Sequence, residues 1–198
     1  MIATLTEIKA LLAVTSTTQD DLLNRLIPIV EDDIRQYCNN GFRDANVYIS
    51  SGDISFTQNS TSADVINIDA GTDGFVDALF KAGQTVQVRG SYNNDGFFDV
   101  ETVSSAAMTL YSSTSRPYFD PLVTEDEGVY VMINKVDYPN ALKNVMAQMC
   151  RYKLSNYDYQ VASESVSRYS VSYNMDSASG YPKTLMSGLN RWRRPVFA

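Results

Sequence analysis

The first forty residues carry apolar side chains at the spacing of two successive helices. Thr4 followed by Glu7 is the pattern of a capping box, in which two side chains satisfy free backbone amides at a helix start. A short helix is therefore predicted to begin after Thr4 and to end near Val14. Its apolar stripe comprises Leu5, Ile8, Leu11 and Leu12.

A long amphipathic helix is predicted after the polar stretch TSTTQDD. Its Ser and Thr side chains can cap a helix, and Asp20 and Asp21 are acids of the kind that a helix N-terminus favours. Pro28 lacks a backbone amide, so a kink is expected there. Gly41 is the expected left-handed residue that ends the helix. The apolar positions recur every four residues, at Leu22, Leu26, Val30, Ile34 and Cys38.

The pattern changes after Phe42 to short β-like runs separated by turn residues. Six such runs within about seventy residues predict a small antiparallel sandwich or barrel. The runs are VYIS (47–50), DISFTQ (53–58), DVINID (64–69), QTVQVRG (84–90), FFDVETV (97–103) and MTLYSS (108–113).

The stretch between the fourth and fifth runs is rich in oxygen-bearing side chains, so it has to be tested as a calcium site. An EF-hand loop starting at Ser91 would need an acidic first ligand and a glutamate at its twelfth position, which is Thr102 here. Both ligands are missing. Asn, Asp and Gly tolerate the positive φ of a tight turn, which predicts a hairpin turn at Asn93, Asn94, Asp95 and Gly96.

Helical spacing returns in the last third of the chain. Asp137 and Pro139 are suited to a helix start, and Leu142, Val145, Met146 and Met149 form an apolar stripe. An extended segment is predicted next, because Tyr169, Val171 and Tyr173 alternate with polar residues. The final helical stretch carries Leu185, Leu189 and Trp192 at helical spacing, with Arg191, Arg193 and Arg194 at its end.

Charge and composition restrict the possible functions. The chain of 198 residues has no histidine, which removes the commonest general base and the commonest metal ligand. Residues 43–133 carry four basic and thirteen acidic residues, whereas residues 134–198 carry nine and four. This asymmetry indicates separate modules, which we place at residues 1–42, 43–133 and 134–198. Cys38 and Cys150 have no metal-binding spacing and are expected to be buried and reduced.

Enzymatic, cofactor and membrane functions find no support in the motifs. The chain has neither a GxSxG nor a GxxxxGK motif, and a glycosidase pair formed by Asp95 and Glu101 has nothing to place it at one cleft. We expect no catalytic activity, no metal and no cofactor. The N-terminus does not have the pattern of a signal peptide, and no apolar run approaches the roughly 20 residues of a bilayer span.

Two blocks of the chain resemble a known family. The segments LTEIKALLAV and TQDDLLNRLIPIVEDDIRQYCNNGF are similar to the opening helices of the head-to-tail connector, or head-completion adaptor, family of tailed bacteriophages. The C-terminal order also agrees: a helix over residues 139–158, then SESVSRYSVSY, then GLNRWRRP. Compact members of that family join the two blocks with little between them. The resemblance therefore implies an α+β protein, a helical connector core with an inserted small antiparallel β sandwich or barrel.

The resemblance implies a structural role in the virion neck at the portal vertex. Copies would assemble in the host cytoplasm, dock on the portal protein as a ring, expected to be dodecameric, and contact the next neck or tail completion protein. DNA would pass through the channel without specific binding.

The C-terminal segment is the expected docking arm. We hypothesise that residues 163–198 bind the portal, because an alternating strand and a basic end are poorly suited to a private core. The residues expected to contact the portal are Tyr169, Val171, Tyr173, Leu185, Leu189, Arg191, Trp192, Arg193 and Arg194.

An alternative reading is a phage tail or accessory module that binds carbohydrate or a receptor. In that reading Tyr92, Phe97 and Phe98 would form a stacking platform. Packing of the same rings into the β core is the competing interpretation.

Overall fold

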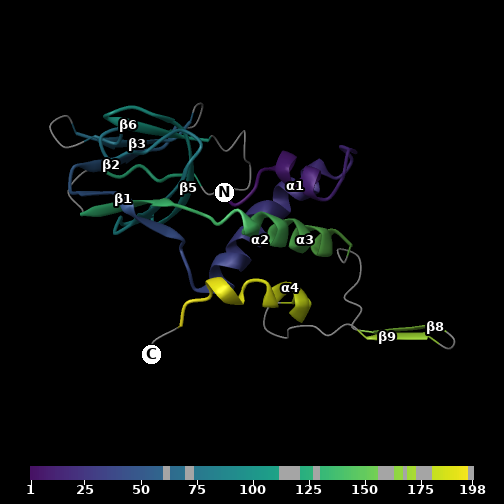
Figure 1. Ribbon diagram of the computed structural model, residues 1–198. Helices are drawn as coiled ribbons and strands as arrows, with labels where there is room; N and C mark the ends of the chain where they lie inside the picture. The colour runs from purple at the N-terminus through teal and green to yellow at the C-terminus, as the bar shows by residue number, and fades with distance from the viewer. Residues whose placement is uncertain are drawn as a thin grey trace. The chain divides into compact units, whose positions relative to one another are not determined.

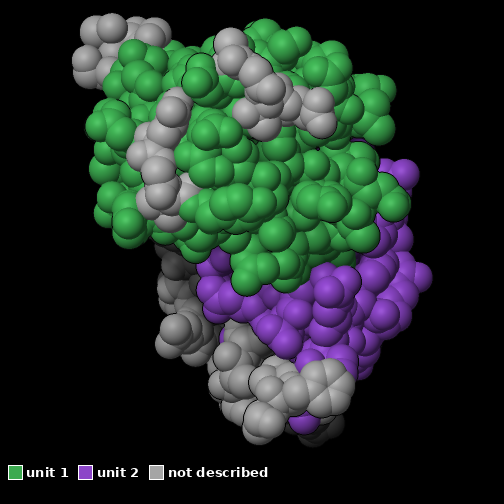
Figure 2. All heavy atoms as spheres, turned by 90° about the vertical axis from the view of Figure 1, so that its left-hand side faces the viewer, with its two compact units in different colours: residues 1, 41–137 green, residues 2–40, 138–198 purple. Residues whose placement is uncertain are grey.

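The computed structural model describes residues 1–59, 63–69, 74–111, 121–126, 130–155, 163–166, 169–172 and 180–195, with the backbone alone in 163–166 and 169–172. The chain divides into two compact units (Figures 1 and 2). Unit 1 comprises residue 1 and residues 41–137, and unit 2 comprises residues 2–40 and 138–198. Helices make up most of the described part of unit 2, whereas unit 1 contains an antiparallel sheet.

Unit 2 is built from two pieces that are distant in sequence. Helices α1 (Leu5–Leu11) and α2 (Asp20–Cys38) come from the first piece, and α3 (Ala141–Ser155) packs against both. The second piece adds α4 (Lys183–Ser187), the 3-10 helix η1 (Asn190–Trp192) and the strand pair β8 (Ser163–Val166) and β9 (Tyr169–Ser172). None of the helices in the described ranges has the length and apolar character needed to span a bilayer.

The predicted capping box is confirmed, as are Asp20 and Asp21 at the start of α2, whereas the predicted capping residues of α2 are wrong. Thr4 accepts a hydrogen bond from the amide of Glu7, and the Glu7 carboxylate accepts one from the amide of Thr4. Gln19 is the N-cap of α2, without a side-chain hydrogen bond. The helix continues through Pro28 to Cys38, and Asn39, with φ of 46°, is its left-handed C-cap. Asn takes the role expected of Gly41 because its short polar side chain tolerates the left-handed conformation.

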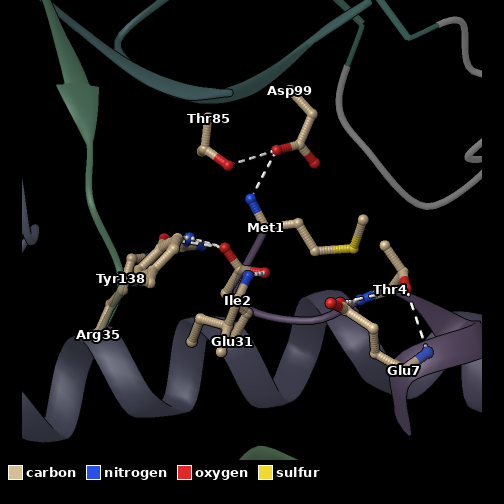
Figure 3. A network of polar contacts seen from close by, with 9 residues as sticks. All are labelled: Met1, Ile2, Thr4, Glu7, Glu31, Arg35, Thr85, Asp99 and Tyr138. Atoms are coloured by element: carbon tan, nitrogen blue, oxygen red, sulfur yellow. Dashed lines mark hydrogen bonds and ion pairs between the residues drawn. The ribbon is translucent and has the colours of Figure 1, made fainter. Parts of the chain in front are cut away.

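A buried carboxylate joins the two pieces of unit 2 (Figure 3). Glu31 on α2 is only 4% exposed, and its Oε1 accepts hydrogen bonds from Arg35 Nη1 and from the Tyr138 hydroxyl, both at 2.9 Å. Its Oε2 accepts the backbone amide of Ile2 at 3.1 Å. Burial, together with the nearby Glu31 charge, raises the pKa of Tyr138, so this phenol stays protonated and donates.

Unit 1 contains a seven-stranded antiparallel sheet in the order β1-β7-β4-β5-β6-β3-β2. This mixture of helices with an antiparallel sheet agrees with the sequence prediction. The strands are β1 (Arg43–Ser51), β2 (Ile54–Thr57), β3 (Val65–Ile68), β4 (Thr85–Arg89), β5 (Gly96–Val103), β6 (Ala107–Leu110) and β7 (Val131–Val136).

All seven strands contribute to one apolar core. Strand β5 connects the two halves of the sheet that surrounds it. Its first half pairs with β4 and its second half with β6, with an irregularity in register between Val100 and Thr102. Such an irregularity lets a strand bend and continue into a differently oriented part of the sheet. Fully buried side chains at the centre of the core include Ile66, Val86 and Val100.

Each of the six predicted β runs contains a strand, but the seventh strand of the sheet was not predicted. Strand β7 alternates between buried Val131, exposed Met132 and buried Ile133, but all three residues are apolar, so the sequence shows no alternation there. Strand β7 lies between β1 and β4 and therefore completes one half of the sheet.

A polar contact also lies within unit 1, where Asp99 Oδ1 accepts the Thr85 hydroxyl at 2.6 Å and the Met1 amine at 2.7 Å (Figure 3).

Glu31→Gln is expected to reduce the free energy of unfolding by about 2–3 kcal/mol, because it removes the charge that compensates the buried guanidinium of Arg35. Asp32→Asn is the matched control. Asp32 is 53% exposed and lies 3.6 Å from the same arginine, so its loss should cost less than about 0.5 kcal/mol. Urea unfolding followed by circular dichroism measures both, and equal losses would contradict the assigned role of Glu31.

Candidate docking surface

Tyr181 fixes the start of the C-terminal segment to the helices of unit 2. The ring is 1% exposed, and its hydroxyl donates a 2.7 Å hydrogen bond to Asp33 on α2. Lys153 on α3 forms an ion pair with the same carboxylate at 3.1 Å, and its Nζ lies 5.1 Å from the centre of the Tyr181 ring. These contacts anchor the segment to two helices at once.

The exposed basic end of this segment is attached to the C-terminal end of α2. The amide of Arg194 donates to the carbonyl oxygen of Cys38 at 2.8 Å, which satisfies one of the carbonyls left free where a helix ends. The side-chain amide of Asn40 donates to the carbonyl oxygen of Trp192 at 3.2 Å. We call the surface formed by Arg191, Trp192, Arg193 and Arg194 the arginine platform.

Two guanidinium groups of the platform lie against aromatic rings. The guanidinium carbon of Arg191 is 3.8 Å from the centre of the Trp192 ring, and that of Arg193 is 5.3 Å from the centre of the Tyr37 ring. The Tyr37 hydroxyl donates to Asn190 Oδ1 at 2.9 Å, which fixes the ring. Stacking restricts the guanidinium planes, while their N–H groups can still bind carboxylates or phosphates.

The platform carries positive charge without an internal counterion. Arg191, Arg193 and Arg194 are exposed, and none forms an ion pair with an acid within the described part of the chain. Three such arginines beside the half-buried ring of Trp192 are well suited to an acidic protein surface.

The structure changes the roles of several residues expected in the docking arm. Leu189 is fully buried and Leu185 half-buried, so these side chains anchor the platform to unit 2. The expectation that residues 163–198 are unsuited to a private core is wrong for this part, because Tyr181 and Met186 are also buried. The stretch is moreover not one helix, since α4 ends at Ser187 and η1 follows separately. Tyr169 and Val171 lie in β9, and Tyr173 lies outside the described residues.

Three contributors to this surface were not identified from the sequence. Tyr37 falls within the predicted long helix and Tyr181 precedes the final helical stretch, and neither has a local signal for its contact. Asn40 had a turn signal but nothing that indicated its bond to Trp192. Their roles arise from contacts between positions more than a hundred residues apart, which local patterns do not encode.

The polar stretch after β4 is arranged for donating hydrogen bonds to acids, not for holding a cation. Asn94 is buried, whereas Asn93 and Asp95 are exposed and Gly96 begins β5. The backbone amides of Tyr92 and Asn93 donate to the carboxylate of Glu125. Nowhere in the described ranges do three or more acidic or cysteine side chains gather as metal ligands.

The stacking platform of the alternative reading is not formed. Phe97 and Phe98 are neighbours on β5 and therefore point to opposite faces of the sheet. Phe98 packs against the apolar core, whereas Tyr92 is 79% exposed. The three rings do not share one surface.

Residues 2–79 match the family model described as phage gp6-like head-tail connector protein. The match covers both N-terminal helices and continues through β1, β2 and β3, which lie in the segment expected to be an insertion. A sequence comparison with curated proteins found no match.

Both cysteine thiols are expected to be unreactive in the native protein. Burial raises the pKa of Cys38 to about 11 and that of Cys150 to about 12, so almost no thiolate is present at pH 8. An aromatic disulfide reagent should react slowly with the native chain and rapidly with both thiols in denaturant. Fast native reaction would contradict the packing.

The same raised pKa values predict a loss of stability in alkali. The unfolded thiols ionise near their ordinary pKa of about 8.5, whereas the folded ones stay protonated. Their contribution to stability is therefore complete below about pH 8.5 and decreases as the pH rises above it. Cys38→Ala and Cys150→Ala, compared with wild type by urea unfolding at pH 7 and pH 10, should lose less stability between the two pH values. An unchanged pH dependence would contradict this.

Proposed function

Because residues 2–79 match the phage gp6-like head-tail connector family, we propose that this chain is a structural protein of the virion that joins the capsid to the neck or tail. Copies form a ring on the portal protein, for which the expected state is a dodecamer, and the ring extends the DNA channel. The helical unit 2 is the connector core, and the β unit is a small sandwich or barrel attached to it.

The observation that carries the docking proposal is the arginine platform. Its cations have no acidic partner within the described residues, and Leu189 and Tyr181 hold it on the body of unit 2. An acidic surface of the portal would supply the missing counterions. Tyr169, Val171 and Tyr173 of the expected docking arm extend the same contact in this proposal.

The negative charge of unit 1 is consistent with a channel through which DNA passes without binding. Unit 1 carries five basic and fourteen acidic residues, a net charge of −9, compared with eleven and nine in unit 2. If these acids line the channel, they repel the phosphates of passing DNA and prevent specific binding. The face opposite the portal then contacts the neck or tail completion protein.

The triple variant Arg191→Glu, Arg193→Glu and Arg194→Glu should abolish docking while the protein stays folded, because these side chains are exposed and reversal places like charges at the contact. Co-sedimentation with DNA-filled heads that lack their connector measures binding, and imaging of the portal vertex detects a ring. Lys183→Glu, an exposed charge on α4, is the control and should bind as wild type does. Full binding by the triple variant would contradict the proposal that the arginine platform contacts the portal.

A further inference from the structure

A short extended segment of unit 1 is bound in the manner of a peptide ligand. Residues 121–126, here called the strap, lie between β6 and β7 in the sequence. Leu122 and Glu125 are buried, whereas the other four residues are exposed, Val123 by 47%. Two buried side chains three positions apart therefore hold the strap.

One side of the strap is bound by β2 and the residues around it. The amide and carbonyl of Glu125 exchange hydrogen bonds with those of Phe56 at 2.9 and 2.8 Å. The amide of Gln58 donates to the Thr124 hydroxyl at 3.2 Å. The strap thus extends the edge of the sheet, in the way that bound peptides add a strand to an exposed edge.

Asn94, whose side chain is almost completely buried, binds the other side of the strap. Its amide nitrogen donates to the carbonyl oxygen of Val123 at 2.9 Å, and its amide oxygen accepts the amide of Val123 at 2.7 Å. A paired contact of this kind recognises an extended main chain whatever the side chain of Val123. The amide of Leu122 in addition donates to Asp64 Oδ2 at 2.9 Å.

The Glu125 carboxylate supplies selectivity for one side chain. Its Oε1 accepts the amide of Tyr92 at 2.8 Å, and its Oε2 accepts the amide of Asn93 at 3.1 Å and the side-chain amide of Asn94 at 3.0 Å. Successive backbone amides directed at one carboxylate form an anion-binding nest. We call the residues that bind the strap, Phe56, Asp64 and 92–94, the groove. The groove therefore selects a large aliphatic residue followed, three positions later, by a glutamate.

We propose that this groove is a peptide-binding site that exchanges its occupant, taking residues 122–125 of a second copy in place of its own. The argument for a second copy is that the groove is complementary to a segment that every copy carries. The connection between β6 and β7, residues 111–130, is far longer than a tight hairpin requires, and long connections in compact domains are commonly functional.

Chain length limits which copies can exchange. Strand β7 begins six residues after Glu125, and six extended residues span at most about 20 Å. Exchange is therefore possible only between copies in direct contact, and in this respect the inference rests on the ring of the proposed function.

Cysteine trapping between copies tests the exchange. Thr57 and Thr124 flank the Phe56–Glu125 pair in antiparallel register, at a position where neighbouring strands approach closely. A Thr57→Cys chain mixed with a mass-tagged Thr124→Cys chain should form the mixed disulfide in assembled rings. Thr57→Cys mixed with Thr184→Cys, an exposed position on α4, controls for random collision. Rings that form without the mixed disulfide would overturn the exchange while leaving the connector function intact.

A peptide experiment tests the groove without any ring. A labelled peptide of residues 121–126 should bind full-length Leu122→Ala/Glu125→Gln, in which the internal strap is weakened, at least about tenfold more tightly than wild type. Replacing the peptide's glutamate by glutamine should weaken binding by at least about tenfold. Equal binding by both peptides would overturn the assigned selectivity.

A second form of the peptide experiment keeps the test decisive if that variant does not fold. Thr57→Cys, which retains the wild-type strap, is incubated with the peptide carrying cysteine in place of Thr124. A mixed disulfide that a scrambled peptide does not form supports the groove. Absence of it would overturn the proposal.

Discussion

The buried carboxylate of Glu31 is the interaction on which the helical unit depends. Unit 2 is assembled from two pieces separated by residues 41–137, and closing so long a connection has an entropic cost that contacts between the pieces must offset. Glu31 binds Ile2 and Arg35 from the first piece and Tyr138 from the second. Because one cation and two neutral donors satisfy this carboxylate, a residue type that is rarely buried can connect distant parts of the chain.

This connection has a direct consequence for the docking surface. Once α2 and α3 are held together, Asp33 and Lys153 can bind Tyr181, and the end of α2 can bind the residues around Trp192. The arginines are thereby presented on a fixed support, and Trp192 and Tyr37 restrict two of their side chains before any partner arrives. Preorganisation of this kind lowers the entropic cost of binding, which favours the role in docking proposed for this small cationic surface.

In unit 1 the constraint is a different one, because the unpaired backbone groups of an edge strand can pair with another chain unless they are covered. The strap covers part of β2, and its only buried side chains are Leu122 and Glu125. The loop that a first reading of the sequence compares with a calcium site is instead the receptor for an acidic side chain. Gly90, with φ of 87°, turns the chain after β4, and the amides of Tyr92 and Asn93 then bind the carboxylate.

The sequence by itself determined the features that depend on neighbouring residues. These include the capping box at Thr4, the apolar stripe of α2, six of the seven strands and the resemblance to a connector family that residues 2–79 confirm. Only the tertiary structure decided that Asn39 ends α2, that Leu189 is an anchor, and that Asn94 and Glu125 form one groove. The physical reason is range: helical and strand periods are encoded within a few residues, whereas burial and charge pairing depend on contacts that exist only after the chain has folded.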